Sequence, residues 1–114
     1  MKQLKIKCWI EEDGEKFYGP GPHILLKEIQ KEGSLSKAAE KMQLSYKKAW
    51  EMVQRLNLGS NHNLVNLKKG GQHGGGAEIT PHAFQIMSAY ELLQDKIKEL
   101  IKAEDELMNV LKKD

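Results

Sequence analysis

Residues 33–57, GSLSKAAEKMQLSYKKAWEMVQRLN, hold two helical patterns separated by only a few residues. Ser34 and Ser45 each precede one of these patterns, and serine is among the residues that best cap a helix N-terminus. Two short helices joined by a tight turn are the sequence form of a helix-turn-helix. The second pattern carries apolar residues at the spacing of a buried helical stripe, namely Ala49, Val53 and Leu56.

The second helix of such a unit enters the major groove of DNA by its first residues, while the first helix crosses the phosphate backbone. Side chains opposite the apolar stripe are then free to touch DNA. Tyr46 can face either the DNA or the core, and Trp50 can either pack on the domain's own helices or lie at the DNA surface. The candidate DNA-binding residues of this helix are Ser45, Tyr46, Lys47, Lys48 and Arg55, with Glu51 and Gln54 on the same face.

The formal net charge of +2 hides an uneven distribution along the chain. Residues 34–73 contain seven lysines and arginines but only two acidic residues, Glu40 and Glu51, which gives a local charge of +5. Such a basic block is what binding to a polyanion needs. A solvated lysine-rich face is the alternative that charge alone leaves open.

A glycine-rich loop, KKGGQHGGGAEIT (68–80), follows the second helix. The segment LVNLKK (64–69) before the glycines and the segment AEIT (77–80) after them both read as short strands. Glycine tolerates unusual backbone angles and lets the chain approach a phosphate closely. Two strands around such a loop, directly after a helix-turn-helix, predict the wing of a winged helix. Its tip is expected to place four side chains against the sugar-phosphate chain: Lys68, Lys69, Gln72 and His73.

Other sites fit this loop less well. A Walker-type phosphate loop needs its glycines before a Lys-Ser/Thr pair and a helix, whereas here the lysines come first and a strand-like segment follows. A metal site would need His73 to meet another histidine, and no pair has i, i+4 helical spacing or a cysteine neighbour. We therefore expect no metal and no cofactor. The remaining histidines, His23, His62 and His82, are expected in loops or facing solvent.

The N-terminus is predicted to form a β-hairpin. Residues 3–12, QLKIKCWIEE, alternate between apolar and polar side chains and end in Asp13-Gly14, a pair preferred in two-residue turns. The pair Phe17-Tyr18 begins the returning strand. The single cysteine, Cys8, excludes an internal disulfide and falls on the apolar side of the pattern, where we expect a buried thiol.

A helix is predicted to begin at Pro22, because proline suits the first turn of a helix. Its pattern HILLKEIQKE puts Ile24, Leu25 and Ile29 on one side, which we expect to be buried. Gly33 can end this helix in the left-handed conformation.

Pro81 opens a last helix that is predicted to run to about Lys112. At 1.5 Å per residue this helix reaches ~48 Å, longer than a compact domain of this size is wide. Its apolar residues form a heptad seam that is interrupted only at Glu104. A second copy of the chain is the simplest cover, and packing within the chain is the alternative, since Phe84 and Met87 should also brace the helix-turn-helix. The predicted dimer interface is Ile86, Tyr90, Leu93, Ile97, Leu100, Leu107 and Leu111.

The sequence has no run of ~18 apolar residues and no apolar signal-peptide core, so we expect a soluble, cytoplasmic protein. It has no nucleophile motif, no HExxH and no clustered carboxylate pair, so we expect no enzyme. The expected fold is mainly α with a small β wing and an N-terminal hairpin. Residues 1–80 would form a winged helix-turn-helix DNA-binding domain, and residues 81–114 a long C-terminal dimerisation helix.

The run GSLSKAAEKMQLSYKKAW, followed by a Leu-Val strand and GGQHGGGAEIT, resembles the N-terminal DNA-binding domain of the molybdate-responsive (ModE-type) transcriptional regulators. The resemblance covers roughly residues 4–100. Its central features are Gly33-Ser34, Ala38-Ala39, Ser45-Tyr46-Lys47 with Ala49-Trp50, and the glycine wing that ends in Thr80. A weaker resemblance extends to the helix-turn-helix of LysR-type regulators.

The resemblance implies a dimeric winged helix on a palindromic operator, with the long C-terminal helix pairing the subunits. It also implies DNA contacts from the start of the second helix of the helix-turn-helix and from the wing. Full-length members of the family carry C-terminal domains that bind molybdate. This chain ends where those domains would begin, so molybdate sensing is not expected of it. Asn63 stands where the family usually has a proline, which affects only the local loop geometry.

We therefore expect a sequence-specific, double-stranded DNA-binding transcriptional regulator that acts as a homodimer, with no small-molecule effector identifiable in the chain. The alternative is a winged-helix protein-interaction module whose C-terminal helix pairs with another protein. Salt-dependent DNA binding separates the two, because each contact to a phosphate releases counterions.

Overall fold

The computed structural model describes residues 1–68 and 75–112. The predicted wing residues Lys69, Gln72 and His73 lie outside the described residues. None of the described helices is long and apolar enough to cross a membrane. The elements in chain order are β1 (Ile10–Glu12), β2 (Glu15–Tyr18), α1 (Pro20–Glu32), α2 (Leu35–Lys41), α3 (Tyr46–Leu58), β3 (Val65–Leu67), β4 (Ala77–Ile79), α4 (Pro81–Ala103) and α5 (Glu106–Lys112).

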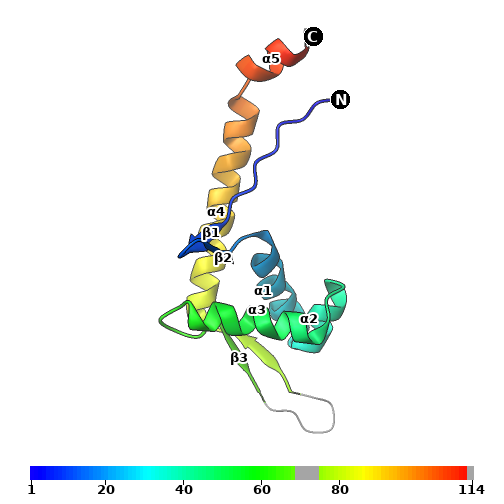
Figure 1. Cartoon of the computed structure of the whole chain (residues 1–114), viewed down its shortest axis with the longest axis vertical. Helices are drawn as coiled ribbons and strands as arrows, with labels where there is room; N and C mark the ends of the chain where they lie inside the picture. Colours follow the sequence, from blue (N-terminus) through cyan, green and yellow to red (C-terminus); the bar gives the residue numbers. More distant parts are fainter. Residues whose placement is uncertain (69–74, 113–114) are drawn as a thin grey trace.

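The molecule consists of a body and an arm (Figure 1). We call residues 10–68 and 75–91 the body, and residues 92–112 the arm. The described chain measures 62 × 29 × 24 Å, and the arm accounts for its elongation. The body has one apolar core to which every helix except α5 contributes. The largest fully buried side chains are Tyr18, Leu25, Leu26, Ile29, Val53, Leu56, Leu64 and Val65.

The helix-turn-helix is confirmed as α2 and α3. The Ser34 hydroxyl accepts a hydrogen bond from the backbone N–H of Lys37 at 3.2 Å, and the Ser45 hydroxyl accepts one from Lys48 at 3.1 Å. Between the helices, Gln43 adopts the left-handed conformation with a φ of 58°, which makes the turn tight. The predicted stripe of α3 is buried, namely Ala49, Val53 and Leu56.

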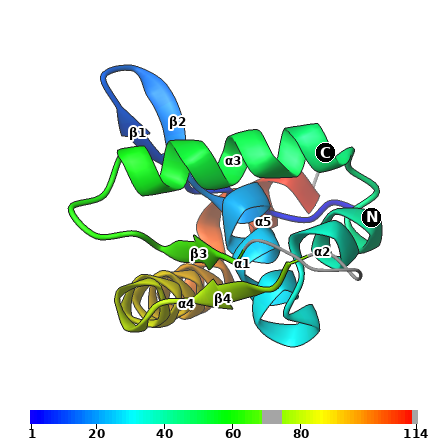
Figure 2. The same cartoon turned by 90° about the horizontal axis from the view of Figure 1, so that it is seen from below.

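The wing strands are also confirmed, although β3 and β4 are only three residues each. They pair antiparallel, with Val65 opposite Ile79 and Leu67 opposite Ala77. Figure 2, which looks at the molecule from below, shows the pair between α3 and α4. The backbone N–H of Ala77 donates to the carbonyl of Gly33 at 3.0 Å, which ties the wing to the start of the helix-turn-helix.

The N-terminal hairpin is present but shorter than predicted. The turn at Asp13-Gly14 has positive φ at both residues, 52° and 84°, as a tight two-residue hairpin turn requires. Strand β1 begins only at Ile10, and residues 1–9 are not in a strand. These nine residues run beside the arm instead, where the ammonium group of Lys2 donates to the carbonyl of Leu111. Cys8 is half-buried against the core rather than fully buried.

Helix α1 differs from the prediction in its buried face. It begins at Pro20 rather than at the predicted Pro22 and ends at Glu32, and the φ of 67° at Gly33 confirms the left-handed cap. Leu25 and Ile29 are buried as expected, but Ile24 is exposed. His23, expected in a loop or facing solvent, is instead a core residue with only 5% of its surface exposed. The predictions for Ile24 and His23 were wrong because the buried face of α1 includes His23 and Leu26 beside Leu25 and Ile29. Ile24 lies on the opposite face of the helix.

The last helix is two helices rather than one. Helix α4 ends at Ala103, and Glu104 adopts an extended conformation with a ψ of 113°. The Glu104 carboxylate then accepts a hydrogen bond from the backbone N–H of Leu107 at 3.0 Å, so it caps the start of α5. The interruption of the heptad pattern at Glu104 therefore marks a real break in the helix.

Candidate nucleic-acid interface

The first turn of α3 presents its side chains to solvent. Ser45, Lys47 and Lys48 are exposed, and Tyr46 has 54% of its surface exposed. The Tyr46 side chain therefore lies outside the core. Trp50 is also at the surface, with 43% of its area exposed.

Arg55 does not join this group. It lies ten residues after Ser45 along α3, which corresponds to ~15 Å along the axis at 1.5 Å per residue. Its side chain lines hollows beside the hairpin, together with Lys16 and Phe17. The structure therefore separates Arg55 from the leading end of α3.

A hollow of about 380 Å³ lies between the starts of α2 and α3 and the base of the wing. Lys68 lines it from the wing, where its ammonium group lies 3.3 Å from the exposed Glu78 carboxylate. Both partners are mostly exposed, so this ion pair contributes little to stability and leaves the lysine available. The hollow also contains a residue that sequence reasoning missed, Ser36, whose only sequence signal was its place in the first turn of a short helix. Its lining residues are Ser34, Leu35, Ser36, Tyr46, Leu67, Lys68, Gly75 and Gly76.

Asn57 fixes the wing to α3, and sequence reasoning missed this residue too. Its amide oxygen accepts hydrogen bonds from the backbone N–H groups of Leu64 at 2.8 Å and Val65 at 3.2 Å. Its amide nitrogen donates to the Val65 carbonyl at 3.0 Å. One side chain thus satisfies three backbone groups at the start of β3, which fixes the angle between the wing and α3.

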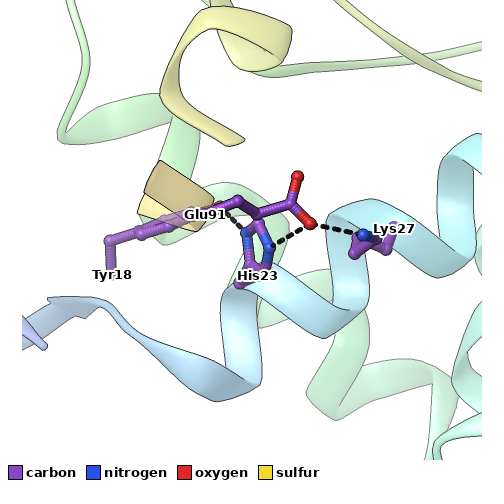
Figure 3. A network of polar contacts seen from close by, with 4 residues as sticks. All are labelled: Tyr18, His23, Lys27 and Glu91. Atoms are coloured by element: carbon purple, nitrogen blue, oxygen red, sulfur yellow. Dashed lines mark hydrogen bonds and ion pairs between the residues drawn. The ribbon is translucent and has the colours of Figure 1, made fainter. Parts of the chain in front are cut away.

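A polar cluster joins α1 to α4 inside the body (Figure 3). The Tyr18 hydroxyl lies 2.6 Å from Nδ1 of His23, and the His23 and Tyr90 rings are 4.9 Å apart. Nε2 of His23 lies 3.5 Å from the Glu91 carboxylate but makes no hydrogen bond within residues 1–68 and 75–112. The Lys27 ammonium group donates to that same carboxylate.

Burial and the hydrogen bond from Lys27 together set the protonation states in this cluster. It lowers the pKa of His23 below 6.5, although the nearby Glu91 carboxylate opposes the shift. It raises the pKa of the Tyr18 hydroxyl above its usual value, so the hydroxyl keeps its proton. The hydrogen bond from Lys27 lowers the pKa of Glu91. At neutral pH the cluster therefore contains a neutral imidazole, a neutral phenol and a charged carboxylate.

The arm exposes apolar side chains along one side. Leu93, Leu100 and Leu107 are exposed, with 59% of Leu100 accessible, while Ile97 and Leu111 in the arm and Ile86 in the body are half-buried. Tyr90, predicted at the dimer interface, is instead buried in its own chain and donates to the Cys8 carbonyl at 2.8 Å. A groove of about 570 Å³ lies between the arm and two residues outside the predicted interface, Leu4 and Ile6.

Within the described residues, no group of three or more histidine, cysteine, aspartate or glutamate side chains is arranged to hold a metal ion. The His62 and His82 rings do meet, with centroids 5.4 Å apart. His62 comes from the loop after α3, and His82 from the first turn of α4.

A helix-turn-helix followed by an antiparallel strand pair and a further helix defines a winged-helix protein. Among solved structures, a variant of ZitR from Lactococcus lactis has the same fold, with a TM-score of 0.53 at 19% identity over 97% of this chain and 79% of that one. No family model matches the chain.

Among curated proteins, the transcriptional regulator ModE of Haemophilus influenzae is 36% identical over 94 residues, which is 82% of this chain and 37% of that protein. The DNA-binding transcriptional dual regulator ModE of Escherichia coli is 33% identical over 108 residues, 92% of this chain and 41% of that protein. ModE of Yersinia pestis is 39% identical over 91 residues, 80% of this chain and 35% of that protein. The chain is thus related to the ModE-type transcriptional regulators, and it spans about two fifths of their length.

Proposed function

We propose that the chain binds double-stranded DNA in a sequence-specific manner and regulates transcription as a homodimer. The observation that carries this proposal is the first turn of α3, where Tyr46, Lys47 and Lys48 are exposed and Tyr46 shares a hollow with the wing residue Lys68. The related ModE proteins, one of them named as DNA-binding, support the same reading. In this proposal residues 1–80 form the DNA-binding unit and residues 81–114 the dimerisation helix.

In this proposal some of the polar and basic side chains contact phosphates and others contact base edges. Phosphate contacts set position and affinity, whereas contacts to base edges in the major groove set sequence preference. Tyr46, Lys47 and Lys48, at the start of α3, are the candidates for base edges, since a lysine can donate to the acceptors of guanine. Lys68 and the hydroxyl of Ser36, around the hollow at the wing, are candidates for phosphate. We also assign phosphate contacts to the wing residues Lys69, Gln72 and His73.

The arm supports the homodimer. Exposed leucines along one side of a helix are costly in water and mark an interaction surface when they are contiguous. A second copy related by two-fold symmetry would cover the same surface on both chains, and palindromic DNA matches that symmetry. The proposed interface contains Ile86, Leu93, Ile97, Leu100, Leu107 and Leu111.

Sedimentation across a salt series tests this proposal. We expect a particle of about twice the chain mass of 13.0 kDa that binds random duplex DNA at low salt and releases it as salt rises. A selection from a pool of random duplexes should then enrich one palindromic sequence. A particle of single-chain mass that ignores DNA at every salt concentration would overturn the proposal.

A protein-interaction module is the second candidate, and the same exposed arm favours it. In that case the arm pairs with a different protein, and the first turn of α3 does not bind DNA. Neither candidate involves catalysis. The salt series separates them, because only the regulator loses DNA affinity steeply with added salt.

A further inference from the structure

A separate cavity of about 350 Å³ lies where the hairpin, the start of α1 and the middle of α3 meet. This volume is within the range of small-molecule sites in proteins. Figure 2 shows the hairpin and the start of α1 beside α3. The cavity shares no lining residue with the hollow at the wing, so it is distinct from the proposed DNA surface at the start of α3.

The cavity has an apolar wall that is held in place. Trp9, Phe17 and Met52 form it, and Trp9 is exposed. Gly19 lets the Trp9 segment approach closely, because a Cβ at this position would lie 2.7 Å from the Cβ of Trp9. The indole N–H of Trp9 also donates to the Glu11 carboxylate at 2.9 Å. The indole ring is therefore positioned before any ligand arrives, which lowers the entropy cost of binding.

The same cavity is lined by three cationic side chains, Lys7, Lys16 and Arg55. The Lys16 ammonium group lies 4.7 Å from the centroid of the Trp9 ring, so charge and apolar surface adjoin. None of the three takes part in an ion pair among the described residues. Three cations beside an aromatic wall are complementary to an anion that carries an apolar group.

The surroundings disfavour nucleic acid at this position. The tip of the hairpin carries Glu12, Asp13 and Glu15, which line the neighbouring hollow rather than this cavity. These carboxylates would repel a phosphate backbone passing over the hairpin. Lys16 and Arg55 also line that neighbouring hollow, which Glu51 lines as well, whereas the described residues that line this cavity include no acid.

We propose that this cavity binds a small amphipathic carboxylate, with its apolar ring on Trp9 and Phe17 and its carboxylate between Lys16 and Arg55. The binding step is independent of the proposed DNA function. Met52 and Arg55 belong to α3, so an occupied cavity contacts the DNA-reading helix directly. An effect of the ligand on DNA affinity would rest on the proposed function, and binding to the protein alone would not.

Fluorescence provides a direct test, since Trp9 and Trp50 are the two tryptophans of the chain. In the Trp50→Phe protein, without DNA, the emission of Trp9 is titrated with phenylacetate and with its neutral amide. We expect saturable binding of phenylacetate that is about tenfold tighter than binding of the amide, because the charge-assisted contacts are lost in the amide.

Variants locate the site. The double substitution Lys16→Gln/Arg55→Gln should weaken phenylacetate binding about tenfold, since two charge-assisted contacts are removed. Lys31→Gln, at the other end of α1, is the matched control and should leave the affinity unchanged. Equal weakening by both changes would overturn the assignment.

Two further probes distinguish a small carboxylate from a non-specific anion and from the C-terminus of a protein. Inorganic phosphate that competes as well as phenylacetate would show a general counterion effect and would refute the site. A short peptide that ends in phenylalanine carries the same carboxylate and ring. If the peptide saturates Trp9 while phenylacetate does not, the cavity takes a protein C-terminus and the small-molecule proposal fails.

Discussion

The Tyr18 hydroxyl lies 2.6 Å from Nδ1 of His23, and both residues are buried where α1 meets α4. The phenol keeps its proton, since burial raises its pKa, so it donates to Nδ1 when the imidazole proton is on Nε2. That tautomer aims the Nε2 proton toward the Glu91 carboxylate, 3.5 Å away. The junction between the body and the arm is thus arranged around a neutral imidazole.

The first prediction is a loss of stability in mild acid. The unfolded chain binds a proton at His23 near pH 6.5, whereas burial lowers the pKa of His23 in the folded chain. The stability from the neutral ring is therefore present above pH 6.5 and is lost as the pH falls toward the folded pKa. We expect the melting temperature to fall between roughly pH 7 and pH 5, and His23→Gln to reduce that fall.

The control for this prediction is His62→Gln, since His62 is exposed in the loop after α3. This variant should keep the full dependence of the melting temperature on pH. An identical pH slope in the wild type and in His23→Gln would show that other groups cause the acid sensitivity.

The second prediction concerns the three hydrogen bonds of Asn57. Asn57→Ala leaves the Leu64 and Val65 N–H groups without their acceptor. We expect a loss of about 2 kcal/mol in the free energy of unfolding, since unsatisfied buried groups cost roughly 1–3 kcal/mol. Denaturant unfolding measures this loss. Asn63→Ala, an exposed residue nearby, should change stability by less than about 0.5 kcal/mol, and equal losses would refute the role of Asn57.

The helix-turn-helix was readable from the sequence because its signals are local. A serine cap needs only the N–H groups of the following turn, as Ser34 and Ser45 show. The break at Glu104 was also visible as a gap in the heptads, although only the structure shows that the Glu104 carboxylate starts a new helix.

Contacts between segments that are distant along the chain could not be predicted from the sequence in the same way. Ile24-Leu25-Leu26 is a run of three apolar residues, and periodicity cannot choose which side of α1 faces the core. Packing against β2 and α4 determines which side of α1 is buried. These two elements enclose His23 between Tyr18 and Tyr90. For the same reason the sequence did not reveal the bonds from Asn57 to β3.

The third prediction separates base reading from phosphate binding at α3. Lys47→Ala should weaken binding to the selected palindrome by about 1–3 kcal/mol, the usual value of a good contact to a base. Binding to random DNA should weaken less. Fluorescence anisotropy at fixed salt measures both affinities. Lys31→Ala, at the end of α1, should change neither, and equal losses on both DNAs would reassign Lys47 to phosphate.

The last prediction concerns the leucines of the arm. Leu100 and Leu107 are exposed in the single chain, so Leu100→Asp/Leu107→Asp removes few contacts within it. In a dimer the same aspartates would be buried without partners and like charges would meet across the interface. We expect the sedimenting mass to fall from about twice 13.0 kDa to the single-chain value, with the circular dichroism of the helices largely retained. Leu58→Asp is the matched control, because Leu58 is 86% exposed at the far end of α3. If the double variant keeps the dimer mass, the arm leucines are not the interface.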